Sequence, residues 1–413
     1  MFGVRNFEEF KEKYIYKHTE YFDYQMLFLV LFLCGFGIVM VFSAGSFDAR
    51  VNQGDILYYL KKEMKLMFVG ILFMAILTKI NYHLYSYLTI VFMVFMTAIQ
   101  AYVSFSGVVA NGASRWVTVR GSSFQPSEFA KIALVMYMAQ TCVARYKKLE
   151  NIKDLLKILI FPAALVGLIA IENLSTGIIC GAICGFIWLI ATPNFKNLPI
   201  LILIVVLAVG ILIPLKGGYR LKRITNWAGK TSSSASTGED TATEDENRQT
   251  NQSIYAIGNG GLFGKGLGQG EQKMGNVAQI QNDMIFAAIC EELGFVGGIA
   301  VIIIYIMLIR RMLFIIDGAP DQFGKLLVFG IMIHIALQAM INIAVSTGSI
   351  PNTGVTLPLI SAGGSSLIAT LGEMGIVLSV SRQIQPKSAK VRKVQMKNKN
   401  GRKVKAVKGE ETR

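Results

Sequence analysis

The stretch QNDMIFAAICEELGFVGGIAVIIIYIMLIRR, residues 281–311, decides the fold class. It begins close to an acid, Asp283, and continues as an apolar run over 284–308, which is long enough to cross a hydrocarbon layer about 30 Å thick as a helix. Two further acids, Glu291 and Glu292, lie inside this run, where an ionisable group costs at least about 2.5 kcal/mol at mid-bilayer. Acids in such a place need a pairing or a functional reason.

The rest of the chain repeats this apolar pattern. Hydrophobic residues make up 53% of the 413 residues and charged residues only 16%, against about 25% charged in soluble proteins. This composition excludes a soluble globular enzyme, a nucleic-acid-binding domain and a disordered chain. The sequence predicts an all-α polytopic membrane protein with about ten transmembrane helices. The apolar runs lie at residues 25–44, 64–79, 84–104, 126–144, 156–171, 175–192, 198–215, 284–308, 325–346 and 358–381.

Positive charge gathers at the C-terminus. Residues 382–413 hold twelve Lys or Arg against two Glu and carry most of the net charge of +15. By the positive-inside rule, this tail predicts that the N-terminal segment 1–24 and the basic tail 383–413 are both cytoplasmic, with the membrane domain at 25–382 between them. The tail is also suited to contact anionic lipids, and its charge predicts no nucleic-acid partner.

A long extracytoplasmic loop, residues 216–283, is predicted between the seventh and eighth spans. Its middle, 231–250, is polar and acidic and has no aromatic residue, which predicts a disordered insert. Seven glycines follow between Gly258 and Gly270, yet their spacing fits neither a P-loop nor a dinucleotide fingerprint. Two interpretations stay open for this glycine run: close approach of the backbone to another helix, or contact with an anion or a lipid headgroup.

Asp283 stands where the long loop meets the eighth span, and it has two interpretations. It could cap the helix, because an acid near a helix N-terminus accepts bonds from unpaired N–H groups. It could instead face an outward cavity as a general base whose proton affinity is set by partly dry surroundings. Glu291 and Glu292 lie about 12 to 14 Å deeper along the helix axis, so we expect them to pair with a cation from another helix.

The fourth predicted span, 126–144, begins with Pro126 and carries two charged residues on one face, Glu128 and Lys131. One interpretation is an interfacial cap with a lysine that snorkels to the surface. The other is that Lys131 is a cation for a phosphate-bearing substrate and that Glu128 fixes its position. Upstream, Arg115 follows the motif NGAS and precedes a Trp suited to the membrane interface.

The last two spans are joined by STGSIPNTGVTLPLISAGGSS, residues 346–366. Pro351, Pro358 and the run from Gly363 would break or kink helices near the outer face. Non-helical backbone at membrane depth persists only where it is buried in protein or lines a wet cavity. Glu373 lies deeper in the last span, and the sequence offers no partner for it.

Several of these strings together resemble the SEDS family of bacterial cell-wall proteins, which includes FtsW, RodA and SpoVE. The strings are GASRWV, FQPSEFAKIAL, ENLSTG, AIGNGGLFGKGLG, QNDMIFAAICEELGFVG and IPNTGVTLPLISAGGSSL, in family order between residues 111 and 382. The family fold is a ten-helix membrane bundle, which agrees with the count of apolar runs. The ENLSTG string favours an FtsW-like or SpoVE-like chain over a RodA-like one.

The resemblance implies a peptidoglycan glycosyltransferase that polymerises lipid II at the outer face of the bacterial cytoplasmic membrane, together with a class B penicillin-binding protein and other divisome or elongasome proteins. The family's essential acid falls on Asp283, which would deprotonate the acceptor hydroxyl. Substrate contacts would fall on Arg115, Glu128, Lys131, Lys265, Ser365 and Ser366. The departing pyrophosphate needs cations, which Arg115, Lys131, Lys265 or a divalent metal such as Mg²⁺ or Mn²⁺ could supply.

Two other functions remain alternatives. A polar-lined bundle could move lipid II across the membrane as a flippase, although the hydropathy shows no inverted repeat and the polar residues gather at the outer ends of the spans. The chain could also be a non-catalytic scaffold that binds a class B penicillin-binding protein, in which case Asp283 would tolerate replacement by Asn.

Overall fold

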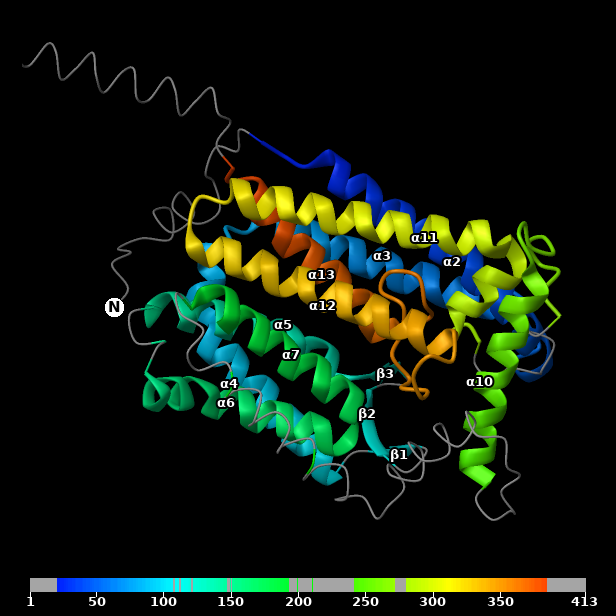
Figure 1. The fold of residues 1–413 in the computed structure, drawn as a ribbon, viewed down its shortest axis with the longest axis horizontal. Coiled ribbons are helices and arrows are strands. Elements are labelled where there is room, and N and C mark those ends of the chain that lie inside the picture. Colours follow the sequence, from blue (N-terminus) through cyan, green and yellow to red (C-terminus); the bar gives the residue numbers. More distant parts are fainter. Residues whose placement is uncertain are drawn as a thin grey trace, which may run out of the picture.

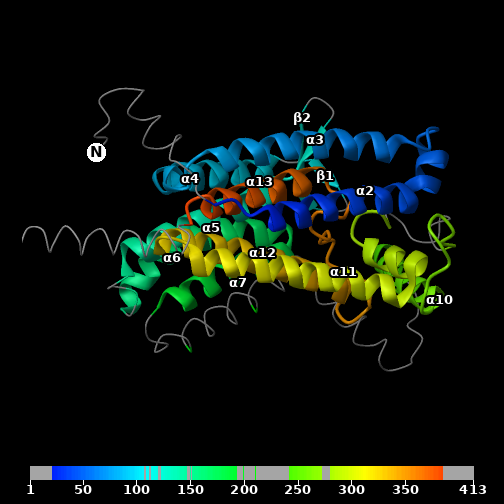
Figure 2. The ribbon, with the colours of Figure 1, turned by 90° about the horizontal axis from the view of Figure 1, so that it is seen from above.

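The computed structural model is a bundle of long helices that run side by side, crossed at one end by helix α10 (Figures 1 and 2). It describes residues 21–106, 108–110, 113–119, 122–146, 149, 151–192, 199, 210, 241–271 and 280–384. Most of the seventh predicted span, residues 216–240 and 272–279 of the long loop, and the tail from residue 385 lie outside these residues. The described helices are α2 (Tyr24–Asn52), α3 (Tyr58–Lys79), α4 (His83–Ser106), α5 (Pro126–Ala144), α6 (Ile152–Glu172), α7 (Leu174–Ala191), α10 (Thr241–Gly260), α11 (Ile285–Gly318), α12 (Gln322–Ser346) and α13 (Gly364–Ser381).

The membrane character of the chain is confirmed. Seven of the described helices, α2, α4, α6, α7, α11, α12 and α13, are long and apolar enough to span a membrane. Helices α3 and α5 run beside them but are more polar, because α3 begins with charged residues around Glu63 and α5 carries Glu128 and Lys131. The structure therefore supports a multi-pass bundle of helices.

One small sheet interrupts the helical pattern between α4 and α5. Strands β1 (Val108–Ala110), β2 (Ala113–Val119) and β3 (Ser122–Phe124) pair in order as an antiparallel meander. This sheet was not predicted from the sequence. The β-branched residues of WVTV in β2 are typical of a strand, and they were too few to be recognised next to the apolar runs.

The prediction of a disordered insert at 231–250 is wrong for its second half, because α10 begins at Thr241. One side of the helix packs on the bundle: Ser253 is buried and its hydroxyl donates to the Ser346 carbonyl at 3.0 Å, and Gln249 accepts from Asn352 at 2.9 Å. These tertiary contacts, which composition cannot reveal, order a segment that is polar in sequence.

Both ends of the described chain lie at the same end of the bundle (Figure 1). Asp23 caps α2 and pairs with Arg311 near the end of α11 at 2.6 Å. Ile384, just after α13, packs on Gly318 at the end of α11. Helix α11 extends ten residues past the predicted span, to Gly318, so that these contacts form.

The last helix, α13, begins at Gly364, six residues after the predicted start of the span at 358. The residues before it, from Thr347 to Gly363, form an irregular segment that folds back among α2, α11 and α12 (Figure 1). The reason is Pro358 and the following glycines, which favour non-helical backbone.

Candidate functional site

The central polar feature of the bundle is an ion pair on α5. The Lys131 ammonium donates to both carboxylate oxygens of Glu128 at 3.0 Å, and the two residues are only 1% and 7% exposed. The pair forms because residues three apart lie on the same face of a helix. A snorkelling lysine would reach the surface, so that interpretation is wrong, and Glu128 fixes the position of Lys131.

The pair is extended by a line of polar residues on one face of α12. His334, Gln338 and Asn342 follow one another at four-residue spacing, and each is at most 1% exposed. Gln338 accepts a hydrogen bond from Lys131 Nζ at 2.9 Å and lies 2.6 Å from His334 Nε2. On the other side, His334 Nδ1 lies 2.8 Å from Glu373 on α13. Glu373 thus has a partner that the sequence did not indicate.

The two serines at the start of α13 join the same polar group. Ser365 Oγ accepts from the backbone N–H of Gln125, just before α5, at 3.0 Å. Ser366 Oγ accepts from Thr356 Oγ1 at 3.1 Å, and Gln338 Nε2 donates to the Thr356 carbonyl at 3.1 Å. The structure therefore brings Ser365 and Ser366 together with Glu128 and Lys131.

Asp283 lies in the turn just before α11 and is partly exposed. The N-cap position of α11 is Met284, whose side chain makes no capping bond, and Asp283 precedes it by one residue. The Asp283 carbonyl accepts from Asn342 Nδ2 at 2.8 Å. Since Asn342 and Gln338 are one turn apart on α12, about 6 Å along the axis, the polar face of α12 links the Asp283 turn to the Lys131 group.

The irregular segment between α12 and α13 is held by side chains from neighbouring helices. Asn342 donates to the Val355 carbonyl at 2.8 Å, and the Tyr305 hydroxyl of α11 donates to the Pro358 carbonyl. Leu359 is buried with φ of 65°, a left-handed conformation that costs energy for a residue with a side chain. Of the two alternatives for this backbone, burial in protein or the lining of a wet cavity, its part from Leu357 to Ser361 is buried in protein.

The glycine run, residues 258–270, forms backbone hydrogen bonds with α11 where this helix is interrupted. At Gly294, φ is 72° and ψ is −171°, so the helix is interrupted there. The freed carbonyls of Glu291 and Glu292 accept from the N–H groups of Lys265 and Gly266, both at 3.0 Å. Beyond the break, the N–H of Phe295 donates to the carbonyl of Gly261 at 2.9 Å. The interpretation of close backbone approach is thus confirmed, since this contact needs residues without side chains.

The side chains of Glu291 and Glu292 point into the same contact. Glu292 accepts from the Ser43 hydroxyl at 2.6 Å and from the Gly268 N–H at 3.2 Å, and Glu291 accepts from the Glu271 N–H at 2.8 Å. The sequence predicts a cation as the partner of these two acids, whereas the donors seen here are a hydroxyl and two backbone N–H groups, all neutral. Such bonds fasten the glycine run to α2 and α11.

Lys265 belongs to this glycine contact. Its ammonium pairs with Glu271 at 2.9 Å, and its side chain is 28% exposed. The structure does not bring Lys265 to the Lys131 group, because its backbone is bonded to the Glu291 carbonyl on α11. Arg115 lies on β2, but its side chain is outside what the structure describes. Of the predicted substrate contacts that the structure describes, Glu128, Lys131, Ser365 and Ser366 are brought together and Lys265 lies apart from them.

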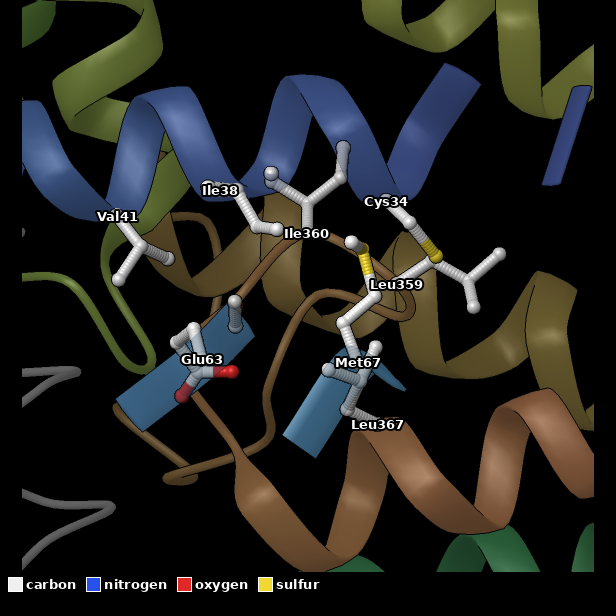
Figure 3. A pocket seen from close by; sticks show the side chains of 10 residues that line it. Cys34, Ile38, Val41, Glu63, Met67, Leu359, Ile360 and Leu367 are labelled. Carbon is white, nitrogen blue, oxygen red and sulfur yellow. The ribbon is translucent and has the colours of Figure 1, made fainter. Parts of the chain in front are cut away.

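A further buried acid, Glu63, lies at the start of α3. It is 4% exposed and borders a small pocket between α2, α3, α13 and the irregular segment (Figure 3). The other lining side chains that face this pocket are nearly all apolar, among them Val41, Met67 and Leu367. This pocket is separate from the Lys131 group.

His334, Gln338 and Asn342 were not predicted from the sequence. A signal for them was present, because polar residues recur every four positions in the apolar run HIALQAMINIAV, which places them on one helix face. Within the described residues, no three His, Cys, Asp or Glu side chains come together in a way that could hold a metal ion.

Known proteins share these sequence features. Residues 24–385 match the model of a family described as cell cycle proteins, FtsW/RodA/SpoVE. A probable peptidoglycan glycosyltransferase FtsW from Geobacter sp. (strain M18) is 32% identical over 377 residues, 89% of this chain and 99% of that relative. Stage V sporulation protein E of Bacillus subtilis (strain 168) is 34% identical over 367 residues, 87% of this chain and 97% of that relative.

Solved structures show the same fold. The rod shape determining protein RodA of Thermus thermophilus matches with a TM-score of 0.64 at 23% identity, over 89% of this chain and 98% of its own. A chain from a peptidoglycan synthase complex, described as coordinating polymerization and crosslinking, matches with a TM-score of 0.71 at 22% identity, over 87% of this chain and 98% of its own. This chain therefore belongs to the FtsW/RodA/SpoVE family, the SEDS family whose motifs its sequence carries.

Proposed function

We propose that this chain polymerises lipid II into glycan strands at the outer face of the cytoplasmic membrane, as a peptidoglycan glycosyltransferase of cell division or cell-shape synthesis. Family membership over most of the chain supports the glycosyltransferase activity. The observation that carries the site is the hydrogen bond from Asn342 to the Asp283 carbonyl, because it ties the candidate base to the buried Glu128–Lys131 group through one face of α12.

Asp283 would act as the general base. Its carboxylate takes the proton of the acceptor sugar hydroxyl, and the hydroxyl oxygen then forms a bond to the anomeric carbon of the donor. The bond from that carbon to the pyrophosphate breaks, and the lipid pyrophosphate leaves with the electron pair. A base that is only partly exposed suits this role, because it keeps access to substrate while losing part of its hydration.

Lys131 would stabilise the negative charge that develops on the leaving pyrophosphate. Its ammonium is closed to solvent in this conformation and donates to Glu128 and to Gln338, whose amide also bonds to Thr356 in the irregular segment. These side chains must therefore rearrange before a phosphate can reach Lys131. The position of Lys131 would be fixed by Glu128, and the irregular segment would be held beside it by Ser365 and Ser366. Arg115 and Lys265 remain candidates for further contacts with the phosphates.

A divalent cation would enter with the substrate. Since no set of three metal-binding side chains comes together in the part of the chain described, the pyrophosphate itself would supply most of the ligands for Mg²⁺ or Mn²⁺. The metal would neutralise phosphate charge, and the chain would contribute the base and the lysine.

A class B penicillin-binding protein is the proposed partner, together with other divisome or elongasome proteins. A match to a chain from a peptidoglycan synthase complex supports this. Both termini would be cytoplasmic, and the lysine-rich tail would contact anionic lipids. The relatives named FtsW and stage V sporulation protein E support a division-type or sporulation-type chain over a RodA-like one.

The test is reconstitution of the full chain with its class B partner in liposomes that contain lipid II. Glycan strands longer than the disaccharide, formed without any added glycosyltransferase, would support the proposal. Headgroup translocation without polymer would favour the flippase alternative. Polymer that appears only when another glycosyltransferase is supplied, and rises when this chain is present, would indicate a scaffold.

A further inference from the structure

His334 and Glu373 form a buried pair that the proposed reaction does not use. They are 1% and 0% exposed, and His334 Nδ1 lies 2.9 and 2.8 Å from the two carboxylate oxygens of Glu373. The pair joins α12 to α13 in the middle of the membrane bundle. Ionisable groups at such depth are costly, so the pair needs a physical reason.

The orientation of the neighbouring Gln338 amide is fixed by two independent contacts. Lys131 Nζ can only donate, so the Gln338 atom 2.9 Å away must be the amide oxygen. The Thr356 carbonyl can only accept, so the Gln338 atom 3.1 Å from it must be the amide nitrogen. Both contacts give the same orientation.

That orientation determines the protonation of His334. Its Nε2 lies 2.6 Å from the Gln338 oxygen, which only accepts, so Nε2 must carry a hydrogen. One proton is then shared between Nδ1 and Glu373. Whether it resides on the imidazole or on the carboxyl group, the two residues together carry no net charge, which suits a buried site.

Lys131 and His334 therefore both donate to the Gln338 amide oxygen, so the position of each donor depends on the other through this amide. The titratable side chains that face this group are Glu128 beside Lys131 on α5 and Cys180 on α7. Among the described residues, His334 is the only donor to the Gln338 oxygen other than Lys131.

We propose that His334, protonated at Nε2 and kept neutral as a pair by Glu373, is a positioning residue that orients Gln338 and through it the Lys131 ammonium toward a pyrophosphate anion. The identity of that anion rests on the proposed function. The Glu373 side chain serves to hold the imidazole in the tautomer that donates. The pair thus sets the geometry of Lys131 without touching substrate.

The first test is spectroscopic and needs no enzymatic activity. The chain has three histidines, His18, His83 and His334, so ¹⁵N-histidine labelling of the full protein in nanodiscs gives few imidazole signals. The signal lost in His334→Gln should show a hydrogen on Nε2. This signal should shift in Lys131→Met. It should stay unchanged in the control variant Lys325→Met, because Lys325 lies near the start of α12, away from His334 on the same helix. An unprotonated Nε2, or no shift in Lys131→Met, would overturn the inference.

The second test separates positioning from packing. The double variant His334→Leu with Glu373→Leu removes the donor to Gln338 but keeps the net charge and fills the space with apolar atoms. Its KM for lipid II should rise about tenfold at an unchanged folded yield, as expected for the loss of one hydrogen bond near a charge. In Glu373→Gln, the new amide can still donate to Nδ1, so KM should rise less.

A folded double variant with the wild-type KM would overturn the positioning role. If the wild-type chain makes no polymer at all, the proposed function fails. The histidine signals would still decide whether His334 and Lys131 are coupled through Gln338.

Discussion

The side-chain amide of Asn342 donates hydrogen bonds of 2.8 Å to two carbonyls, that of Asp283 before α11 and that of Val355 in the irregular segment before α13. Asn342 itself is fully buried. One residue of α12 thus holds both the turn with the candidate base and the irregular segment that Gln338 also contacts.

Replacing this amide should damage both the fold and the site. Asn342→Leu leaves two buried carbonyls without this donor, at about 1 to 3 kcal/mol for each unsatisfied group. We expect a lower unfolding temperature in detergent and a loss of polymerisation that exceeds the loss of folded protein. Thr347→Ala is the matched control at the end of the same helix, because its exposed hydroxyl bonds only to nearby residues. Similar losses in the two variants would contradict this role of Asn342.

The Glu128–Lys131 pair should behave as a unit. Lys131→Met leaves the buried Glu128 carboxylate without its cation, and breaking a buried ion pair lowers the free energy of unfolding by about 3 to 5 kcal/mol. Adding Glu128→Gln removes that charge, so the double variant should recover most of the stability while staying inactive in lipid II polymerisation. Thermal unfolding and polymerisation of the two single variants and the double variant form the measurement. Additive losses of stability would show that the two residues do not act on each other.

The break in α11 requires glycine at 294. The φ of 72° disfavours any side chain, and a Cβ added there would lie only 2.3 Å from the Gly264 nitrogen, so no alanine fits without moving the backbone. We expect Gly294→Ala to lower the folded yield and to increase proteolysis of the glycine run. Gly258→Ala is the control, since Gly258 is an exposed helical residue of α10 with nothing within 4 Å. There alanine should stabilise by up to about 1 kcal/mol. Equal effects at the two positions would contradict this explanation of the break.

A pH dependence is expected at the α11–α12 turn, at the opposite end of the bundle from α10. Burial of Asp321 opposes its ionisation, but bonds from His83, the Gly324 N–H and Tyr82 outweigh this and hold the pKa of Asp321 below its ordinary value. A lowered folded pKa contributes stability above the unfolded pKa, and this stability is lost as pH falls through the folded value. Stability measured from pH 6 down to pH 3 should therefore fall less in Asp321→Asn than in wild type. Asp317→Asn, at an exposed acid nearby, should keep the wild-type profile.

The sequence predicts the helices better than it predicts their contacts. Helix α5 begins at Pro126 and ends at Ala144, as predicted, because proline at the first turn and an unbroken apolar run are local signals. The serines 365 and 366 and the pair on α5 were identified by motif, and the structure brings them together. The local sequence was sufficient there.

The partner of Glu373 could not be predicted in the same way. Periodicity places His334 on one face of α12, but which helix that face meets depends on how α12 and α13 pack and rotate in the bundle. Helix α10 was missed for a related reason, because its buried side is small and polar and is recognisable only once Ser346 and Asn352 lie against it. Both errors concern tertiary contacts between distant parts of the chain.

The most direct test of the central claim is the initial rate of lipid II polymerisation by wild type and Asp283→Asn, each with the class B partner at equal amounts of folded protein. The Asn keeps the backbone carbonyl that Asn342 holds but removes the base, so we expect a rate lower by at least about a hundredfold. Equal rates for the two proteins would contradict the assignment of Asp283 as the general base.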